Sequence, residues 1–340
     1  MTLRYVLGID QGGSKTHAVV ADETGNLLGV GWGCGACHSE SGLEIAMQAV
    51  QEAAGVALEA AGIETSDIFS VAAGMTGIDW PHEAPLLRDA LSRQLQVPGQ
   101  RIQAANDAVI ALRAGTSSPS GCVLCAGSGL NCAVRRDARH EYVFGFYINE
   151  NCQGGSALAE RAIQAVLDAE ARLAGPTLLT GLLLDFFGFK TVDELLMAKV
   201  TTGLGRERKL EVPKLLEQAA AMNDLQALDV LSRFGRDIAR YAVAGLRRMD
   251  MLERPVEVVL SGSVFKCQIP VLQESVAAEI HRHAAQARIV DSVYEPVIGA
   301  VLMALDSLEG TNPKGIEAHI KRDAKRFDMI RKNGKGANEP

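Results

Sequence analysis

The sequence has few aromatic residues and no long apolar run. Phe, Trp and Tyr make up 5% of its 340 residues, which disfavours an aromatic platform for stacking bases or glycans. Trp32 and Trp80 are interpreted as packing residues, although Asp79-Trp80, which follows Thr76-Gly77, could line a cleft. No segment approaches the roughly 18–20 apolar residues that a spanning helix needs, and no apolar leader precedes the first predicted strand. We therefore expect a cytoplasmic protein without a membrane partner.

An excess of positive charge is also missing. The chain has 34 Lys and Arg against 41 Asp and Glu, a formal charge of −7, which argues against a general nucleic-acid binder. Residues 311–340 are the exception, with eight basic and four acidic side chains. We interpret this basic C-terminal tail as a solvated extension, with docking to an anionic surface as the alternative.

The seven cysteines form no convincing disulfide or metal framework. Their odd number, in a chain without a predicted leader, indicates reduced thiols. Cys34 and Cys37 form one Cys-x-x-Cys pair, and Cys122 and Cys125 form another. Because side chains three apart on a strand point to opposite faces, the second pair is unsuited to one zinc ion. Small buried apolar residues are the favoured interpretation.

The order of predicted elements repeats once along the chain. A length of 340 residues predicts two domains. Strand, glycine-rich turn, strand and strand occur over residues 5–32 and again over 122–146, each followed by helices and a further strand. Helices are predicted at 44–61, 81–95, 107–113, 156–173, 177–187, 192–200, 212–222, 225–249, 271–285 and 296–308. This pattern predicts a duplicated α/β architecture with one glycine-rich hairpin in each half.

Two glycine-rich turns are candidates for binding phosphate. Asp10 ends the first strand and precedes Gly12-Gly13-Ser14, and the second half has Gly127-Ser128-Gly129. Backbone N–H groups without a nearby Cβ can cradle phosphate oxygens. Ser14 or Lys15 could meet a phosphate, and Asp10 could hold a hydrated Mg²⁺. Each turn alone is also compatible with an ordinary hairpin.

Asn106-Asp107 lies between these turns, at a predicted strand-to-helix junction. An aspartate at this place can cap the helix. Near a phosphate clamp, it can instead accept the proton of an attacking hydroxyl. The residues themselves leave both roles open.

Five segments in this order resemble motifs of the actin/hexokinase/Hsp70 ATPase superfamily. The resemblance is strongest to the branch that contains N-acetylglucosamine kinases and BadF/BadG/BcrA/BcrD-type ATPases. The five segments are Gly8-Ile9-Asp10-Gln11-Gly12-Gly13-Ser14-Lys15-Thr16, Asn106-Asp107-Ala108, Ala126-Gly127-Ser128-Gly129-Leu130-Asn131, Leu260-Ser261-Gly262-Ser263-Val264 and Glu295-Pro296-Val297-Ile298-Gly299-Ala300. They span residues 8–300, nearly the whole chain.

The resemblance implies two ribonuclease-H-like domains with ATP and Mg²⁺ in the cleft between them. Residues 1–117 and 118–310 would form the domains, with the 296–308 helix packing back on the first and 311–340 as the tail. Asp107 would be the base that accepts the proton of a sugar hydroxyl. The first motif, including Thr16, would bind phosphate together with 127–129. The adenosine contacts would be Ser261, Gly262, Ser263 and Gly299.

The expected sugar-binding residues depart from the family pattern. The family commonly reads G-D-E-G-S-[AG] where this chain has Cys152-Gln153-Gly154-Gly155-Ser156-Ala157. Gln153 then replaces an acidic residue, for which Glu150 could substitute. The resemblance implies substrate contacts from Asn106, Asn131, Cys37, His38, Glu150 and Gln153. N-acetylglucosamine is the first candidate substrate, before glucosamine and N-acetylmuramate, and we expect a homodimer.

Two alternatives stay open at this point. Asn149-Glu150-Asn151-Cys152-Gln153-Gly154-Gly155 faintly resembles the cysteine motif of activators of 2-hydroxyacyl-CoA dehydratases. Those proteins use ATP hydrolysis and a [4Fe–4S] cluster that bridges two subunits, so Cys152 would be a ligand. A sugar sensor without catalysis on the same fold is the other alternative, and an intact Asp107 argues against it.

Overall fold

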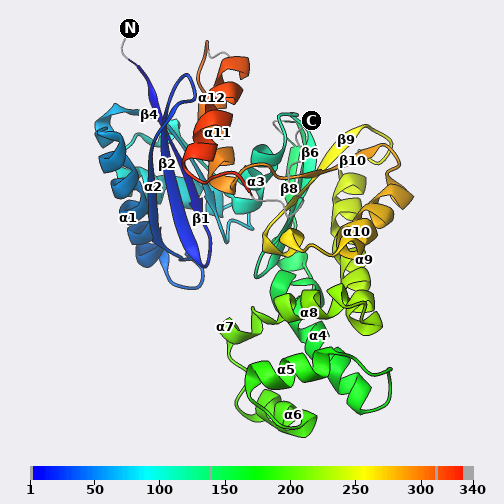
Figure 1. Ribbon diagram of the computed structural model, residues 1–340. Coiled ribbons are helices and arrows are strands. Elements are labelled where there is room, and N and C mark those ends of the chain that lie inside the picture. The colour runs from blue at the N-terminus through cyan, green and yellow to red at the C-terminus, as the bar shows by residue number, and fades with distance from the viewer. Residues whose placement is uncertain (1–2, 138–139, 311–312, 332–340) are drawn as a thin grey trace.

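Two β-sheets organise the computed structural model, which describes residues 3–137, 140–310 and 313–331 (Figure 1). The first sheet has the strand order β3-β2-β1-β4-β5 and the second β10-β9-β6-β7-β8. The first consists of β1 (Tyr5–Gln11), β2 (Lys15–Asp22), β3 (Leu27–Cys34), β4 (Ile68–Met75) and β5 (Ile102–Asn106). The second consists of β6 (Gly121–Ala126), β7 (Leu130–Asp137), β8 (His140–Val143), β9 (Val256–Ser261) and β10 (Ala287–Asp291).

The two sheets have the same topology. In each, an antiparallel three-stranded meander is followed by two strands that add in parallel to its first strand. The carboxyl ends of β1, β4 and β5 therefore lie at one edge, and those of β6, β9 and β10 at the corresponding edge of the other sheet. This arrangement confirms the predicted duplicated α/β architecture with one glycine-rich hairpin in each half.

Helices α1 (Leu43–Ala61) and α2 (Glu83–Leu95) cover one face of the first sheet. Gly29 and Gly31 of β3 allow α1 to approach closely, since a Cβ there would lie 2.1 and 2.0 Å from carbonyl oxygens of the helix. Helices α3 (Asp107–Gly115) and α11 (Pro296–Asp306) pack on the opposite face. One buried cluster joins both sheets through them, with Val6, Val19, Ile110, Val123, Val259 and Val301 among its members.

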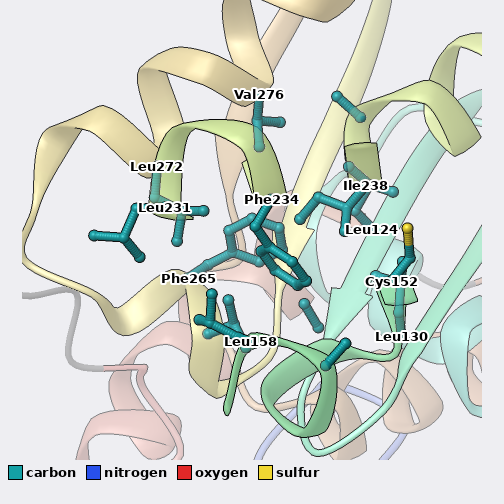
Figure 2. Packing of buried hydrophobic residues seen from close by; sticks show 14 of the residues in the cluster. Leu124, Leu130, Cys152, Leu158, Leu231, Phe234, Ile238, Phe265, Leu272 and Val276 are labelled. Carbon is teal, nitrogen blue, oxygen red and sulfur yellow. The ribbon is translucent and has the colours of Figure 1, made fainter. Parts of the chain in front are cut away.

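A helical region extends the second sheet. It comprises α4 (Gly154–Glu170), α5 (Leu179–Phe187), α6 (Val192–Thr201), α7 (Arg206–Lys209), α8 (Val212–Ala221), α9 (Leu225–Arg248) and α10 (Pro270–His283). Phe234 of α9 is fully buried at the centre of its core (Figure 2). In Figure 1, α5 and α6 lie farthest from the first sheet. Short 3₁₀ helices occur at Thr65–Asp67, Gly99–Arg101, Gly145–Tyr147, Glu150–Cys152 and Ser263–Lys266.

The helix that follows residue 312 packs against the first sheet. Helix α12 (Pro313–Arg326) buries Ile316, Ile320 and Ala324, and a carboxylate oxygen of Asp323 accepts the N–H of Leu27 at 3.1 Å. The interpretation of the basic tail as a solvated extension was therefore wrong for residues 313–331; residues 332–340 lie outside the described part. Of the described helices, none combines the length and apolarity needed to cross a bilayer.

Candidate active site

The first glycine-rich turn joins β1 to β2. Strand β1 ends at Gln11 and β2 begins at Lys15, and the Gly12 N–H donates to the Lys15 carbonyl at 2.9 Å. Gly13 and Ser14 are exposed, and a Cβ at Gly13 would meet nothing within 4 Å. An anion can therefore approach this backbone closely. The Lys15 ammonium lies beside the turn, 3.8 Å from a carboxylate oxygen of Glu295.

Thr16 does not face the space around this turn. Its side chain is fully buried within β2, and its hydroxyl donates to the Cys34 carbonyl at 2.7 Å. This placement disagrees with the predicted phosphate contact, because strand alternation directs the side chain into the sheet's packing. The hydroxyl instead links β2 to the end of β3.

The second glycine-rich turn, Gly127–Gly129, joins β6 to β7 and rests on the start of α4. The N–H groups of Gly155 and Ser156 donate to the carbonyls of Gly127 and Ser128 at 2.7 and 3.0 Å. A Cβ at Gly127 would meet nothing within 4 Å, so this turn is also open on one side. Gly154 has φ +47°, and a Cβ there would lie 2.1 Å from the Gly129 carbonyl oxygen. The close approach of α4 therefore requires glycine at this position.

Gln153 holds the second turn in place. Its Oε1 accepts the N–H of Leu130 at 3.2 Å, while its Nε2 donates to the Ile148 carbonyl at 3.2 Å. Both ends of the side-chain amide are thus engaged by the chain. Gln153 is suited to position the turn, and a sugar hydroxyl would have to displace one of these bonds. Glu150, the predicted substitute for the acidic residue, is exposed in the 3₁₀ helix that precedes it.

Asp107 is the first residue of α3, and Asn106 is the residue that caps this helix. The Asn106 Oδ1 accepts the N–H of Ala108 at 2.9 Å, so the capping role considered for Asp107 belongs to its neighbour. Asp107 is half-buried, and burial, together with the nearby Asp79, raises the pKa of its carboxyl to about 6. A hydrogen bond from the Thr76 hydroxyl works in the opposite direction. A carboxylate with this pKa is mostly ionised at neutral pH yet basic enough to accept a proton.

Asp10 lies at the end of β1 near Asp107. Burial, and then the charge of Asp107, raises the pKa of Asp10 to about 7, although Lys15 acts to lower it. Two neighbouring carboxylates that resist ionisation are stabilised by a divalent cation. Among the described residues, no three His, Cys, Asp or Glu side chains converge as a metal site. Mg²⁺ usually keeps several waters and takes only one or two carboxylates beside substrate phosphates, and Asp10 fits that mode of binding.

Asp79 connects the two halves of the molecule near Asp107. Its Oδ1 accepts the Asn106 Nδ2 at 3.2 Å, and Asn131 of β7 hydrogen-bonds its carboxylate. The Asn131 Nδ2 also donates to the Asn106 Oδ1 at 3.1 Å. The predicted substrate residues Asn106 and Asn131 are therefore linked directly across the halves. Sequence reasoning placed Asp79 only as a candidate cleft residue, and its position after Gly77 at the end of β4 was the available signal.

Cys37 and His38 lie beneath the loop that follows β4. The Cys37 side chain is buried, with its Sγ 3.7 Å from the Thr76 carbonyl oxygen. The His38 Nε2 lies 3.5 Å from a carboxylate oxygen of Glu83, and its Nδ1 is buried without a hydrogen-bond partner among the described residues. Cys37 therefore packs against the loop that contains Thr76. His38, whose Nδ1 has no partner among the described residues, lies close enough to Asp79 to lower the pKa of that carboxyl.

The turn after β9 packs on the end of β6. Gly262 has φ +105°, and a Cβ there would lie 2.1 Å from the Ala126 carbonyl oxygen, so the turn requires glycine. Ser261 is buried and Ser263 is exposed. This close approach brings the predicted adenosine motif next to the second phosphate turn.

Gly299 lies elsewhere, at the crossing of α11 and α3. A Cβ there would lie 1.8 Å from the Ile110 carbonyl oxygen. The residue is buried between the two helices, so it serves their close packing. We do not retain the predicted adenosine contact.

Aromatic side chains are exposed beside Asp79. Trp80 and Phe146, one from each half, stack with ring centroids 6.0 Å apart and exposed fractions of 48% and 69%. Trp32 is also exposed, and the Lys15 ammonium lies 5.4 Å from its ring centroid. Both tryptophans are thus about half exposed and neither lies in a core, although each packs against another ring, Trp32 edge-on against His17 and Trp80 against Phe146.

A cavity of about 950 Å³ lies away from these turns. Its described lining contains neither glycine-rich turn and neither Asp10 nor Asp107; it includes Tyr142, Phe144, Cys152, Arg161, Tyr241 and Arg247. We therefore place the candidate active site by the two turns and Asp107.

Comparison with known proteins decides the family. The model of the BadF/BadG/BcrA/BcrD ATPase family matches residues 7–304. The chain belongs to this family. The resemblance found in the motifs is thus confirmed, and the ATPase family name agrees with the two open phosphate-type turns. The match ends before α12, so the tail lies beyond the part that defines the family.

Curated relatives of this BadF-type ATPase are sugar kinases. An N-acetylmuramic acid/N-acetylglucosamine kinase of Clostridium acetobutylicum is 25% identical over 89% of this chain and 98% of its own length. A glucosamine kinase of Vibrio cholerae is 26% identical over 71% of this chain and 80% of its own. A solved structure named as an N-acetylglucosamine kinase from Chromobacterium violaceum has a TM-score of 0.67, with 21% identity over 89% of this chain and 99% of the other. The last similarity establishes the fold.

The environment of Cys152 in this BadF-type ATPase is unsuited to an iron–sulfur cluster. Its side chain is buried at the edge of the core around Phe234 (Figure 2). A bridging cluster needs its ligand at a surface that faces a second subunit. The site and the relatives thus support the sugar kinase and not the dehydratase activator.

Proposed function

We propose that this protein is an ATP-dependent kinase that transfers the γ-phosphoryl group to a hydroxyl of an amino sugar. The observation that carries the proposal is Asp107, a half-buried carboxylate with a raised pKa. It lies at the start of α3, and the glycine-rich turns follow β1 and β6 of the two sheets. Phosphoryl transfer depends mainly on positioning and charge neutralisation, and these groups supply both.

Each group has a distinct task in the proposed mechanism. The N–H groups of Gly13 and Ser14 and those of Ser128 and Gly129 bind the phosphates, because the N–H groups of Gly12 and Gly127 already donate to carbonyls within their own turns. Lys15 adds a positive charge beside them. Mg²⁺, held through water by Asp10, would neutralise phosphate charge when bound. The oxygen of the sugar hydroxyl attacks the γ-phosphorus, and Asp107 accepts the proton of that hydroxyl. At the same time the bond breaks between the γ-phosphorus and the oxygen that bridges it to the β-phosphate. ADP and the sugar phosphate leave, and the proton passes from Asp107 to solvent.

Asp79 and Asn106 position the catalytic carboxylate. Asn106 fixes the start of α3 through its cap, and its amide also holds Asp79. Asp79 raises the pKa of Asp107, so it increases the basicity of that carboxylate. We infer that these residues set the direction and the proton affinity of Asp107.

The substrate is proposed from the relatives and from the exposed aromatic pair. Relatives are named for N-acetylmuramic acid, N-acetylglucosamine and glucosamine, and N-acetylglucosamine is our first candidate. Trp80 and Phe146 offer an apolar face to a sugar ring beside Asp79. The homodimer and the cytoplasmic location remain predictions from the sequence.

ADP release measured over a panel of sugars tests the proposal. The panel contains N-acetylglucosamine, N-acetylmuramate, glucosamine and glucose, with a reaction lacking sugar as the control. We expect ADP release that depends on an amino sugar and yields equimolar sugar phosphate. ATP hydrolysis at one rate with every sugar and with none would contradict the kinase.

A further inference from the structure

The chain beyond α12 returns to the second sheet. Ile330 forms an antiparallel bridge with Tyr294. The N–H of Arg331 donates to the Val293 carbonyl at 2.9 Å, and the N–H of Glu295 donates to the Met329 carbonyl at 2.9 Å. This C-terminal segment, residues 327–331, therefore runs beside the connection between β10 and α11. It lies outside residues 7–304, which match the family.

The segment buries a cation at the turn after β9. Arg331 is 8% exposed; its Nη1 donates to the Ser261 Oγ at 3.0 Å and its Nη2 to the Gly262 carbonyl at 2.7 Å. Both acceptors are neutral. Within the described parts of the chain, no carboxylate lies within 4.0 Å of this guanidinium. A buried cation without a direct counter-ion is costly, so an anion bound nearby would be favourable.

Other positive charges lie around the same place. Burial lowers the pKa of the Arg331 guanidinium, and Glu295 is the carboxylate that does most to raise it again. Its two oxygens already face the Lys15 and Lys266 ammonium groups, each at 3.8 Å. Glu295 thus lies among three cations, which come from the first glycine-rich turn, from the segment after the Ser261–Gly262 turn and from the C-terminal segment. Asp10 near Lys15 and Asp291 near Arg331 are further carboxylates of this neighbourhood. Three cations that converge from separate segments suit a polyphosphate.

We propose that Arg331 positions the phosphate groups of the bound nucleotide. Its guanidinium is fixed on the turn that packs against Ala126, immediately before the second phosphate turn. A rigid guanidinium with donors left over after two hydrogen bonds can bind a phosphate oxygen in a defined direction. The C-terminal segment then adds to the nucleotide site a charge that comes from outside residues 7–304. The inference rests on the proposed nucleotide substrate.

Calorimetric titration of the full chain with ATP, ADP, AMP and adenosine tests this role. We expect Arg331→Met to weaken ATP and ADP binding by about tenfold or more, since hydrogen bonds to charged groups are lost. Adenosine affinity should stay within about twofold, because that ligand carries no phosphate. Arg331→Lys should recover part of the loss. In steady-state assays, Arg331→Met should raise KM for ATP and leave KM for the sugar unchanged.

Arg322→Met is the matched control. Arg322 belongs to the same basic tail, but its guanidinium contacts Asn26 and Asp323, beside the β2–β3 turn. This variant removes a tail arginine while the separate contacts of residues 329–331 with Val293, Tyr294 and Glu295 still hold Arg331, so we expect nucleotide affinities like those of the wild type. Thermal melting of each variant shows whether the fold is retained.

Three outcomes would overturn the role of Arg331: unchanged ATP affinity in Arg331→Met, an equal loss for adenosine, or tighter ATP binding, which would mean that the arginine occupies the nucleotide's place. A failure of the proposed function gives a different result. A wild-type chain that binds ATP but phosphorylates no sugar would contradict the kinase, while the comparison of phosphate-bearing ligands would still decide the role of Arg331.

Discussion

Asp107 and Asn106 are adjacent, yet they have separable roles. Asn106 caps α3, so Asp107→Asn should leave the helix start and the melting temperature nearly unchanged. Removal of a general base typically costs about 10²–10⁴-fold in rate. We therefore expect turnover with the best sugar to fall at least about a hundredfold at unchanged ATP affinity, measured by coupled ADP release and by calorimetry.

Asp185→Asn is the control for this substitution, because Asp185 is exposed on α5, far along the chain from either turn. Its turnover should match the wild type. Wild-type turnover in Asp107→Asn would show that this carboxylate is not the base.

The raised pKa of Asp107 predicts the pH dependence of the reaction. The base is active when ionised, and burial and Asp79 raise the pKa of its carboxyl to about 6. As pH falls through this value, protonation removes the acceptor, so kcat/KM should decrease by at least about tenfold per unit below pH 6. Protonation of Asp10, whose pKa burial raises to about 7, should add to the loss as pH falls through 7. A stopped assay in buffers from pH 4.5 to 8.5 measures the profile. A flat profile down to pH 5 would contradict a raised pKa in the free enzyme.

At the level of elements, the crossing of α11 and α3 depends on a missing side chain. A Cβ at Gly299 would lie 1.8 Å from a backbone oxygen of α3, which cannot move independently of its helix. Gly299→Ala should therefore destabilise the protein by about 1–3 kcal/mol. Because α3 begins at Asp107, the same change should lower turnover. Urea unfolding and the ADP assay measure the two effects.

Gly55→Ala provides the opposite expectation within α1. A Cβ at Gly55 would meet nothing within 4 Å, and alanine is preferred over glycine inside a helix by about 0.5–1 kcal/mol. This variant should be slightly more stable with normal turnover. Equal stability of the two alanine variants would show that the helix crossing tolerates a methyl group.

Most elements were predictable because their patterns are local. Apolar strands before glycine turns gave both hairpins, and helices such as α9 differ from the prediction only at their ends. The prediction that a helix begins at Pro81 was wrong. Helix α2 begins at Glu83, whose carboxylate accepts the N–H groups of Asp79 and Trp80 at 2.7 Å. This hydrogen bonding organises the loop ahead of the helix and was not evident from proline alone.

For the whole molecule, we predict that the two halves close on ATP and sugar. The two glycine-rich turns belong to different sheets. The buried apolar cluster around α3 and α11 connects these sheets. A ligand that contacts both turns gains most when they approach each other. Small-angle scattering should show a smaller radius of gyration with a non-hydrolysable ATP analogue plus N-acetylglucosamine than with either ligand alone. An unchanged radius at saturation would contradict closure.

Local patterns in the sequence were enough to predict the repeated hairpins, the glycine-rich turns and the position of Asp107 at the start of a helix. These features depend on neighbours in the chain: strand alternation, turn chemistry and the strand-to-helix junction. Motif order along the chain also identified the family, which the comparison confirmed.

Which side chains are available for chemistry depends on contacts between elements that lie far apart in the sequence. Gln153 and Asn131 are engaged by distant backbone and side-chain groups, and Gly299 lies at a helix crossing. Arg331 reaches Ser261 across 70 positions of the chain, from a tail that we interpreted as a solvated extension, with docking to an anionic surface as the alternative. Such contacts depend on how separate elements pack, and local residue patterns carry little information about distant partners. For this reason the sequence located the two candidate phosphate turns but not Arg331, which contacts the neighbouring turn after β9.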